Sequence, residues 1–141
     1  MTPNAAGKHV CKITLYAVIV LELFWMFVET RGDFANGILF YLQAQMNIYV
    51  WAFFTLLFLS SYLLGKKMGA GLIKGHNYVK AAIIYGLLES VILVTYVVMM
   101  LISQRQWGNM LHTVPELALI IIVPVLLLWL VAASSLKQKM K

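Results

Sequence analysis

Two glutamates lie within long apolar runs, where carboxyl groups are rare. Glu22 interrupts the run at residues 13–28, and Glu89 interrupts the run at residues 81–102. A charge at the centre of a bilayer costs about 2.5–3.5 kcal/mol on insertion scales, so such a carboxyl is protonated, hydrogen-bonded to a facing helix, or in contact with water. The two glutamates therefore predict either a midplane site for a proton or cation, or neutral carboxyls that hold helices together.

The positions of the two glutamates suggest a common depth. Glu22 lies ten positions after Lys12, and Glu89 lies nine positions after Lys80. If the lysines mark the membrane boundary, both carboxyls are about 13–15 Å inside it, at 1.5 Å per helical residue. The two runs must cross the membrane in the same direction, so neighbouring helices could bring the carboxyls into contact. The pair would then share a proton and titrate together.

Aromatic side chains on the same runs could complete such a site. Tyr85 and Tyr96 lie four positions before and seven positions after Glu89, near one helical face. Trp25 follows Glu22 by three positions. The predicted transport or cation-binding set is therefore Glu22, Glu89, Trp25, Tyr85 and Tyr96.

Two further carboxylates have simpler interpretations. Glu29 is expected to be a solvated residue at the outer end of the first run. The sequence Thr-Val-Pro-Glu at 113–116 is a capping-box pattern, with Thr113 as the N-cap and Glu116 as the third helical residue. The sequence Arg-Gly-Asp at 31–33 is interpreted as a turn after the first span.

Other chemistry has little support in the sequence. His9, His76 and His112 lie near the ends of the apolar runs, whereas a haem between spans would need histidines inside them. No metal-ligand spacing, nucleophilic triad or phosphate-binding glycine motif is present. We therefore predict no metal, no cofactor and no catalytic residue, and an enzyme acting on lipids is the least favoured class.

The composition identifies the environment. The 141 residues are 62% hydrophobic and 11% charged, whereas soluble domains are about 45–50% apolar and about 25% charged. An integral membrane protein with one domain, residues 1–141, is expected. The net charge is +6, but the lysines flank apolar runs, so anionic lipid is the expected partner and nucleic acid is not. The single cysteine, Cys11, excludes an internal disulfide.

Four apolar runs predict an all-α, four-helix transmembrane bundle. A helix of about 20 residues crosses the hydrocarbon layer, and continuous apolar runs favour helices over barrel strands. We predict spans at about residues 10–29, 46–65, 81–103 and 114–135. The first run is interpreted as a retained span and not as a signal peptide. Residues 34–46 either lengthen the second span or form a short interfacial helix, and the glycine-rich segment 65–80 is expected to be a connector.

The distribution of lysines predicts the orientation. One side of the membrane would carry nine lysines and the other only Arg31 and Arg105, so both termini are expected in the cytoplasm, with the protein in the plasma (inner) membrane. The lysines on the predicted cytoplasmic side are Lys8, Lys12, Lys66, Lys67, Lys74, Lys80, Lys137, Lys139 and Lys141. Those between the second and third spans (Lys66, Lys67, Lys74 and Lys80) are expected to contact lipid head groups.

Small residues and a proline suggest how the spans pack. Ala82, Gly86 and Ser90 form a small-xxx-small stripe, which allows close helix approach within the chain or between copies. Pro124 lies in the middle of the fourth span and acts either as a hinge or as a static kink. A homo-oligomer or a larger membrane complex is expected.

The segment Leu-Glu-Leu-Phe-Trp-Met-Phe-Val-Glu-Thr-Arg-Gly-Asp-Phe, residues 21–34, resembles the first helix of the small multidrug resistance transporters. The shared features are a membrane-embedded Glu followed three residues later by Trp, here Glu22 and Trp25. The resemblance implies a dimeric exchanger in which Glu22 binds protons and cations. The signature of that family's third helix has no counterpart in the third span of this chain.

The preferred hypothesis is a small oligomeric membrane protein that uses a midplane carboxylate for proton- or cation-coupled transport or conduction. The alternative is a non-catalytic subunit of a membrane complex, or an effector that perturbs the bilayer.

Overall fold

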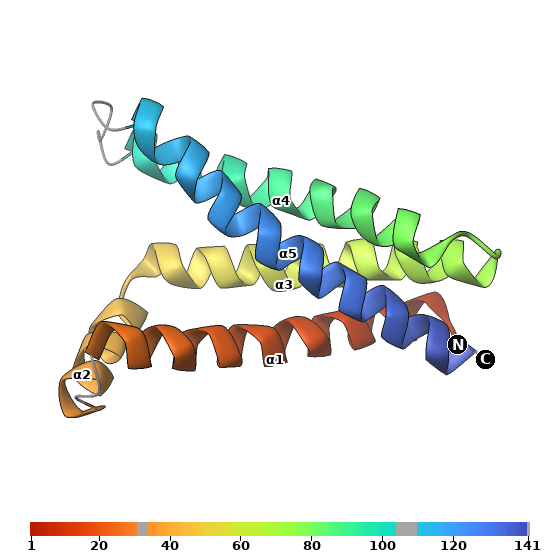
Figure 1. The fold of residues 1–141 in the computed structure, drawn as a ribbon, viewed down its shortest axis with the longest axis horizontal. Helices are drawn as coiled ribbons and strands as arrows, with labels where there is room; N and C mark the ends of the chain where they lie inside the picture. Colours follow the sequence, from red (N-terminus) through yellow and green to blue (C-terminus); the bar gives the residue numbers. More distant parts are fainter. Residues whose placement is uncertain (31–33, 104–109, 141) are drawn as a thin grey trace.

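The described part of the chain forms five α-helices (Figure 1). The computed structural model describes residues 1–30, 34–103 and 110–140, except the side chains at positions 25, 29, 30, 34, 40, 41, 44, 45 and 110–113. The helices are α1 (Pro3–Thr30), α2 (Phe34–Gln45), α3 (Ile48–Ile73), α4 (Tyr78–Ser103) and α5 (Met110–Met140). No strand occurs among these residues, which confirms the predicted all-α class.

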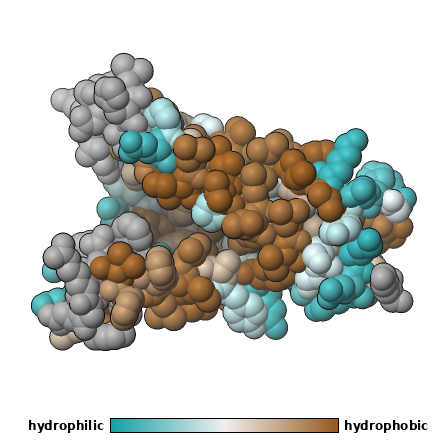
Figure 2. Space-filling view, in the orientation of Figure 1, coloured by the Kyte–Doolittle hydropathy of each residue, from teal (hydrophilic) through white to brown (hydrophobic). Residues whose placement is uncertain are grey.

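Four of the helices are long and apolar enough to cross a membrane. The candidate spans are Pro3–Val28, Ile48–Ile73, Tyr78–Ser103 and Val114–Met140. Figure 2 shows hydrophobic residues over the middle of the molecule and hydrophilic residues gathered at the end that holds the termini. The chain is therefore a small polytopic membrane protein, in which helices satisfy the backbone polar groups that cross the hydrocarbon layer.

Two asparagines cap the N-terminal ends of α3 and α4. Asn47 accepts a hydrogen bond from the backbone N–H of Tyr49, at 2.9 Å, and is the N-cap of α3. Asn77 accepts from the N–H groups of Val79 and Lys80, at 2.9 and 3.3 Å, before α4. Both side chains satisfy donors that have no partner in the first helical turn. Between these helices Gly75 adopts a φ of 84°, a conformation that glycine tolerates best.

The bundle consists of two helix pairs, α1 with α3 and α4 with α5, which are joined by the packing of α3 against α4. In Figure 1, α5 crosses the bundle diagonally, and its C-terminal end lies beside the start of α1. There, His9 Nε2 and Ser135 Oγ are 2.9 Å apart. The two termini and the α3–α4 turn share one end of the bundle, as expected if both termini lie on the same side of the membrane.

The prediction that residues 65–80 form a connector is wrong for most of its length, because α3 continues to Ile73. The glycines that suggested a loop instead allow α1 to approach α3. A Cβ atom at Gly65 would lie 2.8 Å from Val10 Cβ, and one at Gly69 would overlap the side chain of Ala6. Tertiary packing thus outweighs the low helix propensity of glycine.

Two other boundaries are resolved by the structure. Residues 34–46 form no continuation of α3, since α2 is a separate helix that ends at Gln45. The capping-box prediction is wrong, because α5 begins at Met110 and Thr113 lies inside the helix. Several predictions lie outside the described residues or side chains, namely those for Trp25, Glu29, Arg31, the 31–33 turn, Arg105, His112 and Lys141.

The small-residue stripe packs within the chain. Ala82, Gly86 and Ser90 are all buried, and a Cβ atom at Gly86 would lie 2.9 Å from Leu126 Cδ2 and 3.3 Å from Trp129 Cβ on α5. Of the two alternatives for this stripe, the structure therefore shows contact between α4 and α5. Pro124 lies inside α5, which continues on both sides of it.

Candidate functional site

Glu89 is the centre of a buried polar network. It is fully buried, and its Oε1 atom accepts hydrogen bonds from Ser60 Oγ and Ser61 Oγ of α3, each at 2.7 Å. Its Oε2 atom accepts a short hydrogen bond from Trp129 Nε1 of α5. Three donors therefore surround the carboxyl, which offsets the cost of removing it from water.

The network extends to α1 through Thr14. The Thr14 hydroxyl, also fully buried, lies 3.0 Å from Ser61 Oγ and 3.1 Å from its own helical acceptor, the Val10 carbonyl oxygen. The network thus contains side chains from all four long helices, namely Thr14 of α1, Ser60 and Ser61 of α3, Glu89 of α4 and Trp129 of α5. Among the described residues, every buried side-chain polar atom has a partner.

The fit of Trp129 depends on the helix that carries Glu89. Gly86, one turn before Glu89 on α4, leaves room for the Trp129 side chain. The Tyr85 ring stacks on the Trp129 indole, with centroids 5.9 Å apart and an interplanar angle of 29°. Tyr85 therefore contacts Trp129, a member of the network, and its role in transport or cation binding stays a prediction.

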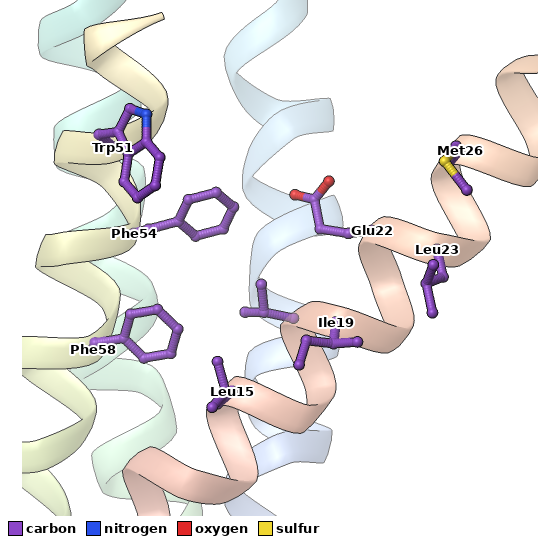
Figure 3. A pocket seen from close by; sticks show the side chains of 9 residues that line it. Leu15, Ile19, Glu22, Leu23, Met26, Trp51, Phe54 and Phe58 are labelled. Atoms are coloured by element: carbon purple, nitrogen blue, oxygen red, sulfur yellow. The ribbon is translucent and has the colours of Figure 1, made fainter. Parts of the chain in front are cut away.

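Glu22 lies in a different environment, on the face of α1 that looks toward α3 (Figure 3). It is half-buried and lines a cavity of about 330 Å³ whose walls are apolar and aromatic. On α3 the wall consists of Trp51, Phe54 and Phe58, and Figure 3 shows the carboxylate pointing toward Phe54. No hydrogen bond or ion pair joins Glu22 to any residue that the structure describes.

A second cavity, of about 220 Å³, reaches Glu22 from the interior side of α1. It lies between α1 and α5, and Phe53, Phe54 and Leu57 of α3 are part of its lining. Figure 2 shows the surface hollowed between α1 and α5 toward the end that carries α2. We call the two cavities together the Glu22 groove.

Pro124 contributes to the same groove. It lines the second cavity together with Ile120. Because proline has no backbone N–H, the Ile120 carbonyl oxygen lacks the helical donor that it would otherwise have. Apart from Glu22 and the fully buried Thr14, the residues that line the second cavity are apolar.

The two glutamates do not lie at equal depth. Glu89 is linked through Ser61 to Thr14, and Glu22 lies eight residues beyond Thr14, which is about 12 Å along α1. The prediction failed because it used Lys12 and Lys80 as equivalent boundaries. Lys12 is well inside α1, which begins at Pro3, whereas α4 begins only two residues before Lys80.

Tyr96 hydrogen-bonds to neither carboxyl, and its contacts lie elsewhere on α3. Its hydroxyl donates a hydrogen bond of 2.7 Å to the Tyr49 carbonyl oxygen near the start of α3, and its ring packs on Phe53. It therefore ties α4 to α3 toward the end that carries α2. The Trp25 side chain lies outside the described residues. Within the described part of the chain, no three potential metal ligands come together.

Sequence reasoning offers Thr14, Ser60 and Ser61 among several polar side chains that could hydrogen-bond to a buried carboxyl, but it does not assign them to the site, and it missed Trp129. The adjacent serines in an apolar run were a usable signal, because a serine pair offers hydroxyls to a facing helix at little steric cost. Trp129 could not be identified in this way, since a tryptophan near a helix end is equally typical of the membrane interface.

Comparison with known proteins found no matching family model, curated protein or solved structure.

Proposed function

We propose that the protein is a small membrane transporter in which the Glu22 carboxylate binds the transported proton or cation. The observation that carries the proposal is an unpaired carboxylate inside an apolar groove, with room beside it. Keeping such a group in a membrane protein is costly unless it is protonated or occupied. A site that needs an occupant to be satisfied is suited to binding and release.

The surroundings of Glu89 differ from those of Glu22, and the difference supports the assignment of the site to Glu22. The Glu89 carboxyl is enclosed by three donors and has no space beside it for a cation ligand. It joins the long helices around the groove. Glu22 has the opposite properties, since it is half-buried, has adjacent cavities and makes no described polar contact.

The lining of the groove favours protons or apolar organic cations over metal ions. Hard metal cations are held by about six or more oxygen ligands, and the groove offers a single carboxylate with few other oxygens. Aromatic faces attract organic cations that are already weakly hydrated. Phe54 and Phe58 stand across the cavity from Glu22 and would provide such faces.

Flux through reconstituted protein tests the proposal. Purified protein is placed in liposomes that contain a pH-sensitive dye, and a potassium diffusion potential or a gradient of tetraphenylphosphonium is applied. We expect Glu22→Gln to reduce proton movement to the rate of protein-free vesicles, because the amide cannot take up a proton. Glu116→Gln is the matched control, since Glu116 is an exposed carboxylate on α5, and its flux should equal that of the wild type.

Wild-type flux of protons and of tetraphenylphosphonium in Glu22→Gln would contradict the proposal. Equal loss in Glu116→Gln would also contradict it, because the effect would then follow the removal of any carboxylate. Correct insertion of each variant is checked by its circular dichroism spectrum and by its elution volume in detergent.

A non-catalytic role in a membrane complex is the second candidate function, and the exposure of α1 favours it. Of the apolar 18-residue stretch within α1, only 12% is buried, against 22% of the corresponding stretch in each of the other three spans. Large side chains on this face, such as Val20 and Phe24, are more than half exposed. A second copy of the chain, or another subunit, would cover this face in either function.

The predicted surroundings belong to the same proposal. Cytoplasmic termini would place the lysine-rich end against anionic lipid of the inner leaflet of the plasma membrane. Lys66, Lys67, Lys74 and Lys80 are exposed at that end of the bundle, as contact with head groups requires.

A further inference from the structure

We propose that a cavity at the lysine-rich end of the bundle binds the phosphate group of one anionic phospholipid. The cavity lies between the turn that joins α3 to α4 and the last turn of α5, and its volume is about 460 Å³. Pockets that hold small ligands typically measure about 300–1,000 Å³. The proposal goes beyond the transport function and does not depend on it, because the cavity shares no residue with the Glu22 groove.

The lining of the cavity combines hydrogen-bond donors with an apolar side. The polar lining residues are exposed and all carry donors, namely His76, Asn77 and Lys137. The apolar and aromatic lining residues are half-buried, namely Leu72, Tyr78 and Met140. No acidic residue of the described chain is part of the lining. An anion with several oxygen atoms, such as a phosphate, could therefore accept from all three donors at once.

Contacts within the chain hold these donors at the cavity. The Asn77 oxygen accepts hydrogen bonds from two backbone N–H groups in the first turn of α4, which leaves its NH2 group as the donor. Lys137 Nζ lies 4.4 Å from the centroid of the Tyr78 ring, a cation–π contact. The His76 ring carries at least one N–H in either tautomer. Groups that are ordered before binding lose less conformational entropy when the ligand arrives.

The same end of the bundle carries positive charge without acidic side chains. It is built from residues 1–12, 65–80 and 134–140, which contain eight of the nine lysines predicted to be cytoplasmic and no aspartate or glutamate. Figure 2 shows hydrophilic residues gathered there. Because no acidic side chain in these segments neutralises the lysines, an anion from outside the chain is the complementary partner.

The position of the cavity favours a lipid over a soluble phosphate. Three candidate membrane spans begin or end beside it, at Ile73, Tyr78 and Met140. The ends of spans lie at the depth of the lipid head groups. The apolar side of the cavity, at Leu72 and Met140, suits the glycerol and the first acyl carbons of a phospholipid, which inorganic phosphate lacks. Basic pockets between transmembrane helices bind anionic head groups in this way.

The cavity is distinct from the lysine contacts that the sequence predicts. Lys66, Lys67, Lys74 and Lys80 do not line it. Exposed lysines attract anionic lipids through the surface potential, without a fixed number of bound molecules. The cavity instead would take one head group, which would contact both α5 and the α3–α4 turn. A count of bound lipids therefore separates the two kinds of contact.

Native mass spectrometry of the full chain in a neutral detergent tests the proposal. Dioleoyl phosphatidylglycerol is added in steps, and dioleoyl phosphatidylcholine is the zwitterionic reference. We expect one phosphatidylglycerol to bind more tightly than any later molecule and more tightly than phosphatidylcholine. Lys137→Gln should weaken this first binding about tenfold, as for loss of one charge-assisted hydrogen bond. Lys66→Gln removes the same charge outside the cavity and should bind the first lipid like the wild type.

Three results would overturn the proposal. Equal weakening in Lys66→Gln and Lys137→Gln would show diffuse attraction by the lysines, and equal affinity for the two lipids would exclude recognition of negative charge. Displacement of the first phosphatidylglycerol by an equal concentration of inorganic phosphate would show that the site takes free phosphate. Lys137→Arg keeps the charge and should keep the first binding, which distinguishes loss of the site from a folding defect seen by circular dichroism. Flux is not part of this measurement, so its outcome is independent of the proposed function.

Discussion

Trp129 donates its indole N–H to Glu89, and both side chains are fully buried between α4 and α5. The two residues are 40 positions apart in the chain, so the contact exists only when the helices have packed. A buried carboxyl that loses a partner is left with an unsatisfied oxygen. The contact therefore links the buried polar network to the pairing of α4 with α5.

Trp129→Phe should destabilise the protein by about 1–3 kcal/mol, the cost of leaving one buried acceptor without its donor. The phenyl ring can still stack on Tyr85, so most of the apolar packing is kept. Reversible unfolding in mixed micelles measures the change. In a double-mutant cycle with Glu89→Gln, the two effects should be non-additive by about 0.5–3 kcal/mol. Additive effects would show that the two side chains do not interact.

Gly86→Val should weaken the pairing of α4 with α5. A Cβ atom at this position would lie 2.9 Å from Leu126 and 3.3 Å from Trp129, so α5 must shift to admit it. Overpacking of this kind costs about 1–3 kcal/mol. Ala52→Val on the exposed face of α3 is the control and should leave the unfolding midpoint unchanged. A midpoint for Gly86→Val equal to that of the control would contradict the packing.

Oligomer formation through α1 is tested by a matched pair of valines. Val20 on α1 and Val91 on α4 are each 64% exposed in the single chain. If a second copy covers α1, Val20→Trp should shift the native mass spectrum in detergent toward monomer, whereas Val91→Trp should not. If the wild-type protein is monomeric in lipid-like detergent, the prediction of a homo-oligomer is wrong.

The predicted orientation is tested by labelling single cysteines. In a Cys11→Ser background, Asn77→Cys marks the turn between α3 and α4, and Gln43→Cys marks α2 at the other end of the bundle. A membrane-impermeant maleimide added to intact cells should label position 43, and position 77 should react only after permeabilisation. The opposite pattern would place the termini outside.

The membrane class and the number of spans could be predicted because apolar runs of sufficient length have few other uses. The limits of α3 could not be predicted in the same way. Gly65, Gly69 and Gly71 favour a loop by propensity, yet the structure has them in a helix. Gly65 and Gly69 are stable there because α1 packs directly against them. Such compensation comes from a partner helix that the local sequence does not contain.

The candidate site could be predicted only in part, because its contacts also join helices that are far apart in the sequence. Glu22 and Glu89 were found because a carboxyl within an apolar run is unusual whatever its partners are. Their different environments were not found, since these depend on where α1 and α4 begin and on which faces meet. Thr14 and Trp129 acquire their roles only through contacts with other helices.

Reaction with a hydrophobic carbodiimide, followed by mass spectrometry and flux measurement on the same vesicles, tests the central claim most directly. The reagent adds to protonated carboxyls that it can reach through lipid, so it should modify Glu22 in the groove and leave the enclosed Glu89 unmodified. Proton flux should then fall in proportion to the fraction of Glu22 that carries the adduct. Complete modification of Glu22 with unchanged flux would contradict the claim that this carboxylate is the transport site.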